Sequence, residues 1–225
     1  INNDASDHNV AIGDSALLGG TGTVKRNIAI GSNALGTGIS NNNQTGTVAI
    51  GYNALYALSS GAGNTAIGYE ALLTETSGTG NTVIGYQAAK VQSGASYNTI
   101  IGREAFLAAD GTESNNVAIG QSSMGGANNN SVDGNVAVGR NSMVGGTGAL
   151  VNNIAIGYFT MDGTGTIAGQ DNIFMGANAG GGTWATAASN YNVGIGSYVM
   201  DAAMNGALYN TAIGHNAASA LTTGD

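Results

Sequence analysis

The nine residues NTAIGYEAL, at positions 64–72, recur with small changes along the whole chain. Close copies are NIAIGSNAL at 27–35, NTVIGYQAA at 81–89 and NVAIGQSSM at 116–124. Aligned on its glycine, the motif occurs twelve times, and successive glycines are 17 to 20 residues apart. A fixed period of this size indicates a stack of small units, so we expect residues 1–225 to form a single repeat array.

The motif, N-x-A-I-G-x-x-A-L, is typical of a short strand that enters a turn. Asn stands four residues before the glycine in eleven copies, and Thr47 replaces it in the twelfth. Val, Ile or Thr follows, then a small residue that is usually Ala, then Ile in ten copies. β-Branched and small apolar residues ending at a glycine predict a strand followed by a turn. The predicted turn glycines are Gly31, Gly51, Gly68, Gly85, Gly102, Gly120, Gly139, Gly157, Gly176, Gly196 and Gly214.

A second strand is expected after each turn. Two mostly polar positions follow the glycine, and a small and then a large apolar residue follow them, as in Ala71 and Leu72. We predict that this Ala-Leu pair forms the second strand and that its large apolar column packs inward. Two strands and two turns per period describe one coil of a parallel β-solenoid, so the predicted fold class is all-β with about twelve coils. At about 4.8 Å per coil, the array would be a rod on the order of 55 Å long.

The two faces of the first strand carry different residues. Alternate side chains point to opposite faces, so the Asn and Ala columns share one face and the Val/Ile/Thr and Ile columns share the other. Both faces are uncharged, which is typical of parallel strands covered on two sides. Either face can be the inner one. Because so small a coil buries little apolar area, we expect the remaining face to meet the same face of other copies around a rotation axis.

The composition disfavours some classes of binding partner. The chain has 39 Gly, no Pro and no Cys, and 42% of its residues are hydrophobic while 8% are charged. Such a balance indicates an ordered chain rather than a disordered one. A net charge of −8 with five basic residues leaves no cationic surface for nucleic acid or an anionic membrane. The apolar runs are also too short for a membrane helix. From the charge we therefore expect no binding to nucleic acid, and from the short apolar runs no insertion into a membrane.

Catalytic and metal chemistry is not expected. The two histidines, His8 and His215, stand near opposite ends of the array, too far apart for a catalytic triad or a histidine metal cluster. Glycine-rich pieces such as GAGNTAIG lack the Gly-Lys-Ser/Thr of a phosphate-binding loop and are predicted to be turns. The chain is therefore predicted to be no enzyme and to hold no cofactor and no metal.

Two roles are considered for the asparagine column: metal ligation and a structural ladder of hydrogen bonds. Metal ligation is disfavoured because the column lacks carboxylates, whereas stacked amides one coil apart can hydrogen-bond along the stack. We therefore predict a structural ladder formed by Asn27, Asn64, Asn81, Asn98, Asn116, Asn135, Asn153, Asn172, Asn192 and Asn210.

Aromatic residues are the candidates for surface binding. Tyr52, Tyr69 and Tyr86 directly follow their glycines on three consecutive coils. Such a row either stacks on sugar rings or covers the turn and stiffens the array. Trp184, the only tryptophan, and Tyr191 lie in the long linker GGGTWATAASNY, and loops on rigid scaffolds often carry binding. Trp184 is either an exposed contact residue or packs beneath its own loop or a neighbouring chain.

The repeated columns resemble the head repeats of YadA-like trimeric autotransporter adhesins, whose motif reads NxVAIGxxA. GYNAL, GYEAL and GYQAA are similar to the related repeats of bacteriophage fibre and appendage proteins. The resemblance covers Asn9 to about Ala218. It implies a left-handed parallel β-roll, an intertwined homotrimer, and display outside the cell on a cell surface or virion. The coils here are longer than the adhesin coil, which leaves the host protein open between the two groups.

Three functions are weighed. The first is a non-enzymatic surface fibre module, part of a longer fibre protein, that attaches to a host surface glycan or protein. The second is a purely structural spacer or decoration fibre whose binding is carried by another segment. The third is ice binding, because Thr65, Thr82 and Thr99 form a column on consecutive coils, although eight of the twelve copies carry Val or Ile there.

Overall fold

The computed structural model describes residues 8–18, 24–36, 44–109, 111–127, 132–145, 148–184 and 187–224. In these residues the chain is all-β, without a helix. Parallel strands stack coil upon coil into a β-solenoid, which confirms the predicted fold class. The chain divides into two compact units, Ile1–Ser114 and Asn115–Asp225, and each is described by itself.

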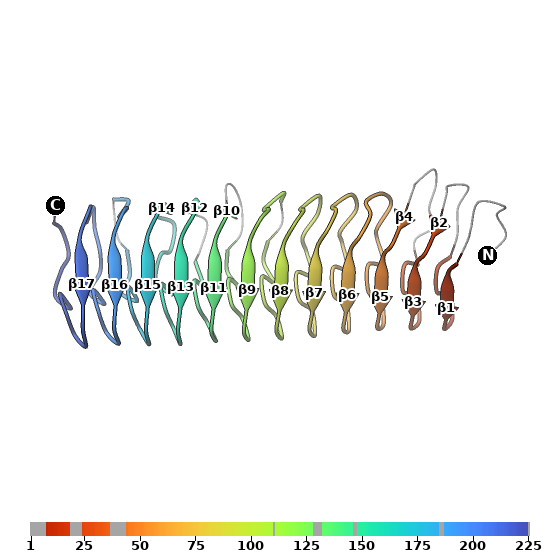
Figure 1. The fold of residues 1–225 in the computed structure, drawn as a ribbon, viewed down its shortest axis with the longest axis horizontal. Helices are drawn as coiled ribbons and strands as arrows, with labels where there is room; N and C mark the ends of the chain where they lie inside the picture. Colours follow the sequence, from red (N-terminus) through yellow and green to blue (C-terminus); the bar gives the residue numbers. More distant parts are fainter. Residues whose placement is uncertain are drawn as a thin grey trace. The chain divides into compact units, whose positions relative to one another are not determined.

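In the first unit, six strands of three residues lie side by side in chain order and pair in parallel (Figure 1). Each motif position pairs with the same position of the next coil, as Thr65 does with Thr82. These strands are β1 (Val10–Ile12), β3 (Ile28–Ile30), β5 (Val48–Ile50), β6 (Thr65–Ile67), β7 (Thr82–Ile84) and β8 (Thr99–Ile101). Two shorter strands, β2 (Val24–Lys25) and β4 (Gln44–Thr45), also pair in parallel.

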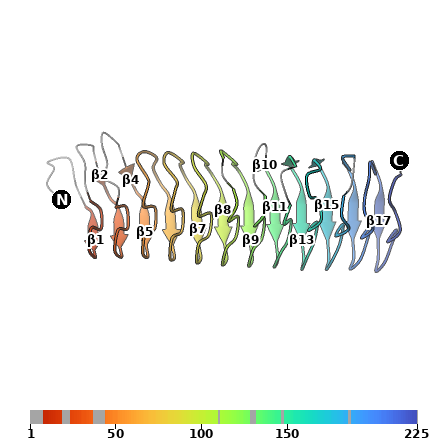
Figure 2. The same cartoon turned by 180° about the vertical axis from the view of Figure 1, so that it is seen from behind.

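The second unit repeats this arrangement. Its three-residue strands also pair in parallel and in motif register. They are β9 (Val117–Ile119), β11 (Val136–Val138), β13 (Ile154–Ile156), β15 (Ile173–Met175), β16 (Val193–Ile195) and β17 (Thr211–Ile213). A second parallel sheet contains β10 (Val132–Asp133), β12 (Leu150–Val151) and β14 (Gly169–Gln170), which lie toward one end of their coils (Figures 1 and 2).

The predicted second strand at the Ala-Leu positions is wrong. These positions form turns, and Leu35, Leu55 and Leu72 have φ angles of about +50°, in the left-handed region that no strand uses. The chain reverses through two left-handed residues, two and four positions after each glycine, and thereby turns within one short segment. The large side chains nevertheless point inward, because the same three leucines are at most 1% exposed. The additional two-residue strands instead end two residues before the Asn column.

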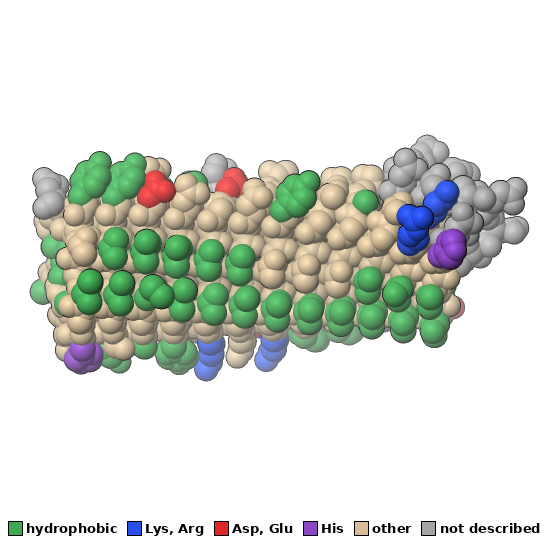
Figure 3. All heavy atoms as spheres, viewed as in Figure 1, with side chains coloured by type: hydrophobic (Ala, Val, Ile, Leu, Met, Phe, Trp, Pro, Cys, Tyr) green, Lys and Arg blue, Asp and Glu red, His purple; other side chains and the backbone are tan. Residues whose placement is uncertain are grey.

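The Asn-Ala face is the inner face of the coil. Ala29, Ala49 and Ala66 are fully buried, whereas their neighbours in the same strands are half-buried or exposed. The Val/Ile/Thr and Ile columns therefore point away from the interior of the single chain. Figure 3 shows them as parallel rows of hydrophobic side chains on one face. Among the described residues of a single chain, nothing covers this outer face.

The turn glycines that face a following coil are required by the stacking of the coils. Gly68 has a φ of +140°, and a Cβ atom there would collide with the backbone carbonyl of Gly85 on the next coil. Gly214 keeps the unusual φ, +126°, but the nearest atom to its Cβ position is 3.9 Å away. The steric requirement therefore comes from the following coil, and the backbone requirement from the turn itself.

Candidate functional site

The asparagines form a buried row of hydrogen bonds inside the coils. Asn81 is representative: its Oδ1 accepts the backbone N–H of Asn98 at 3.0 Å and the Nδ2 of Asn98 at 3.2 Å. Its own Nδ2 donates to Asn64 Oδ1 at 3.1 Å and to the carbonyl of Ala95 at 2.7 Å. The same pattern links successive asparagines from Asn116 to Asn210 in the second unit. Inside these stretches, each amide that has an asparagine on both sides thus ties its own coil to both neighbours.

The row has one defect, at Thr47. The backbone N–H of Thr47 still donates to Asn27 Oδ1 at 2.8 Å, so the hydrogen bond to the asparagine of the preceding coil is kept. Thr47 Oγ1, however, is buried without a hydrogen-bond partner, and so is the Oε1 of Gln44 on the same coil. A threonine hydroxyl is too short to repeat the two-sided amide contact, and the defect therefore leaves polar atoms unsatisfied.

A buried glutamate, Glu75, joins two coils in the first unit. Its Oε1 accepts the backbone N–H groups of Ser77 at 2.9 Å, Gly78 at 2.7 Å and Gly94 at 2.7 Å, and its Oε2 accepts that of Ala95 at 3.2 Å. Its side chain is fully buried. No sequence pattern indicated this role, because the residue stands in an irregular linker. Four amide donors around one carboxylate make this linker an ordered connection between coils.

The tyrosines that follow the glycines form an exposed stack. The rings of Tyr52 and Tyr69 are 5.2 Å apart, those of Tyr69 and Tyr86 are 5.3 Å apart, and both pairs are nearly parallel. The guanidinium of Arg103 lies 5.9 Å from the Tyr86 ring centre. The faces of Tyr69 are therefore occupied by its neighbours, so a sugar ring cannot stack on it without displacing one of them.

An ion pair accompanies this stack. Lys90 Nζ lies 2.7 Å from Glu70 Oε2, which also accepts a hydrogen bond from Gln87 Nε2 at 2.9 Å. The Lys90 ammonium lowers the pKa of Glu70, and Glu70 in turn raises the pKa of Lys90. The nearby Glu70 carboxylate also raises the pKa of Tyr69. These shifts favour the charged pair and a neutral phenol, which is a surface contact rather than a reactive arrangement.

Trp184 is not a surface residue, which corrects the expectation of an exposed contact. It is 2% exposed, and its Nε1 donates to the carbonyl of Gly180 at 3.3 Å. The indole ring lies against Gly169, where a Cβ atom would approach Trp184 Cζ3 to 2.6 Å. Of the two readings, packing beneath its own linker is the one that the structure shows within the chain.

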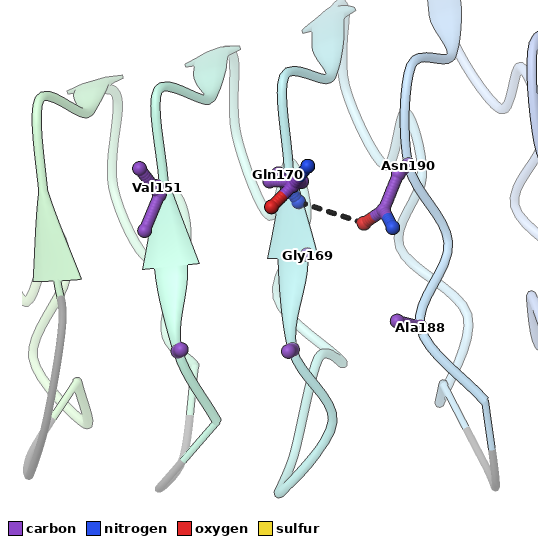
Figure 4. A pocket seen from close by; sticks show the side chains of 7 residues that line it. Val151, Gly169, Gln170, Ala188 and Asn190 are labelled. Atoms are coloured by element: carbon purple, nitrogen blue, oxygen red, sulfur yellow. Dashed lines mark hydrogen bonds between the residues drawn. The ribbon is translucent and has the colours of Figure 1, made fainter.

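Tyr191 is exposed and forms a second stack, with Tyr209. The two rings are 5.0 Å apart and parallel within 3°, and Gln170 Nε2 donates to the Tyr191 hydroxyl at 2.7 Å. Beside them is a depression of about 150 Å³ (Figure 4). Its lining includes Gln170 and Asn190, joined by a hydrogen bond of 2.9 Å from the Gln170 N–H to Asn190 Oδ1. This depression is small, uncharged and open, and it holds no catalytic arrangement.

All nine tyrosines of the chain are exposed, with exposed fractions from 37% to 69%. In contrast, Phe106, Phe174 and Trp184 are buried in the coils. The tyrosines therefore lie at the surface, and these three aromatic side chains lie in the interior. Tyrosines at the residue before the Asn column, such as Tyr97 and Tyr209, adopt left-handed φ angles of about +60°, which the sequence pattern did not reveal.

Within the described ranges, no group of three or more His, Cys, Asp or Glu residues is placed to hold a metal ion. The same residues include no helix that is long and apolar enough to cross a membrane. Finally, no protein-family model, curated protein or solved structure matches this chain.

Proposed function

We propose that the chain is a non-enzymatic structural module of a surface fibre, which self-associates as a homotrimer through its outer face. The observation that carries this proposal is the exposed apolar face of the solenoid (Figure 3). Val10, Ile28, Ile101, Ile195 and Ile213 are 36% to 70% exposed on it. Contiguous apolar surface of this kind marks an interaction site in soluble proteins.

The composition of the outer face supports a partner with the same face. Neither outward column of the three-residue strands contains a charged residue in any of the twelve copies. The face is also regular, because every strand pairs with its neighbours in motif register within its unit. An uncharged, repetitive face is complementary to itself, and closed symmetric assemblies use such faces. The number three, the handedness and the extracellular location on a cell surface or virion come from the resemblance to YadA-like heads and phage fibres.

The test is the mass of the folded chain in solution. Light scattering should give about 66 kDa, three times the 22.1 kDa of the chain. Ile84→Lys, on the outer face of β7, should reduce this mass, because a lysine there would be buried without a partner charge. Gln121→Lys adds the same charge at an exposed turn position and should leave the mass unchanged. A folded parent sample of about 22 kDa would contradict the proposal.

Attachment to a host glycan or protein is the second candidate function. The observation that favours it is the exposure of every tyrosine, since tyrosine is enriched at recognition surfaces. Tyr191 and Tyr209 are the best sites to test because they form an exposed pair beside the depression at Gln170. Binding of the parent to a glycan array or to host cells, lost in Tyr191→Ser/Tyr209→Ser, would support attachment. Absence of binding by the parent would leave the structural role alone.

A further inference from the structure

We propose that Thr65, Thr82 and Thr99 fix the axial register in which copies of this chain associate. The inference rests on the proposed self-association through the outer face, and it identifies the residues that align the copies along the solenoid axis.

The three threonines occupy the last three strands of the first unit, in an outer-face column that is apolar in the three strands before them. The coils before them carry Val10, Ile28 and Val48 at the same position. The threonines occupy three consecutive strands, paired Thr65 to Thr82 to Thr99. Threonine is drawn tan in Figure 3, and a tan gap interrupts one of the two green rows there.

The companion column stays apolar beside this gap. Ile67, Ile84 and Ile101 stand two residues after the threonines and point to the same side of the sheet. The band formed by Thr65, Thr82 and Thr99 is therefore a local polar segment within an apolar face, and not the edge of that face.

The threonine hydroxyls are available for contacts with another copy. All three side chains are half-buried on the outer face, and none of their hydroxyls hydrogen-bonds to another residue of the described part of the chain. A hydroxyl that becomes buried at an interface must find a partner, or its desolvation disfavours the complex. Copies aligned in register bring the three hydroxyl layers to the same level, where they can satisfy one another.

The apolar layers alone cannot specify this alignment. Valine and isoleucine differ by one methylene group, so a face made only of these residues would tolerate a shift by a whole coil with little loss. A shift by one coil places Thr65 of one copy opposite Val48 of another, and each further coil misplaces another threonine. One buried polar layer among apolar layers fixes register in other self-associating folds by the same physics.

The absence of cysteine from the chain allows a direct test of register. Chains carrying Ile84→Cys and differently tagged chains carrying Ile67→Cys are refolded together and oxidised under mild conditions. A disulfide between two Ile84→Cys chains reports alignment in register, and a mixed disulfide between an Ile84→Cys chain and an Ile67→Cys chain reports a shift of one coil. The triple variant Thr65→Val/Thr82→Val/Thr99→Val is compared with the parent, and Thr65→Ser/Thr82→Ser/Thr99→Ser, which retains the hydroxyls, is the matched control.

We expect the valine variant to increase the ratio of mixed to in-register disulfides roughly tenfold, since one unpaired buried hydroxyl layer no longer penalises the shift. The serine variant should keep the parent ratio. An unchanged ratio in the valine variant, with an oligomeric mass, would overturn the register inference while leaving the self-association proposal intact. A monomeric parent would overturn both.

Discussion

The asparagine row makes its strongest prediction at Asn81, where Asn81→Thr reproduces the natural defect seen at Thr47. Asn81 is fully buried, and its amide makes four hydrogen bonds. Two of its partners keep a second contact: Asn64 Oδ1 still accepts the backbone N–H of residue 81, and Asn98 Nδ2 still donates to the carbonyl of Glu113. The backbone N–H of Asn98 and the carbonyl of Ala95 lose their Asn81 partner.

The expected cost follows from those two groups. A buried polar group left unsatisfied costs about 1–3 kcal/mol, so Asn81→Thr should lower the free energy of unfolding by roughly 2–6 kcal/mol. Urea denaturation followed by circular dichroism measures this change, at one fixed protein concentration because association would shift the midpoint.

Two comparison variants define the result. Thr47→Asn is the reverse change, and it should raise the free energy of unfolding by about 1 kcal/mol because it replaces a buried unpaired hydroxyl with a ladder amide. Gln121→Ala, at an exposed turn position, should change it by less than about 0.5 kcal/mol. A loss below about 1 kcal/mol for Asn81→Thr would refute the view that the amide row stabilises the stack.

Three other changes test other parts of the coil. Gly68→Ala should destabilise the fold by at least about 2 kcal/mol more than Gly214→Ala, because only Gly68 faces the backbone of a following coil; thermal unfolding of the two variants decides this. Glu75→Ala should cost about 3–5 kcal/mol in urea denaturation, since it removes the acceptor of four N–H groups, those of Gly78 and Ala95 in buried hydrogen bonds. Lys90→Ala should change stability by about 0.5 kcal/mol or less. Lys90 lowers the pKa of Glu70, so the small stabilisation by this ion pair is present above the ordinary glutamate pKa of 4.5. The stabilisation is lost as the pH falls through the lowered pKa of Glu70. A difference in stability between the parent and Lys90→Ala that grows on acidification would contradict this expectation.

The sequence allowed the solenoid and the parallel register to be predicted, because both follow from the period of the motif. It left open which face of the first strand is the inner one, and only the structure shows that the alanine column is buried. It failed at the Ala-Leu pair, where strand propensity suggested an extended chain and the structure has a turn. Leucine has no preference for a left-handed φ, so nothing in its identity reveals that Leu72 adopts +50°. The conformation is imposed by the preceding glycine turn and by the burial of the leucine side chain in the inner core.

The surface residues were harder to predict for a different reason. Burial of Trp184 depends on the absence of a side chain at Gly169, a residue of the preceding coil, and a sequence motif does not contain such long-range contacts. The role of Glu75 likewise depends on the amide groups of Gly94 and Ala95 one coil further on. Tyr52, Tyr69 and Tyr86 were found by their column, but only their geometry shows that their ring faces are already used.

Substitutions on the two faces of the same strand therefore have different consequences. On the inner face, a substitution such as Thr47 breaks a repeated contact and leaves buried atoms unpaired within the chain. On the outer face, the substitutions at Thr65, Thr82 and Thr99 break no contact within the described part of the single chain. Their cost or benefit arises only when another surface covers them, because a half-exposed hydroxyl is satisfied by water. Under the proposed self-association, departures from the repeat on the outer face act on the alignment of the copies, whereas those on the inner face act on the stability of each coil.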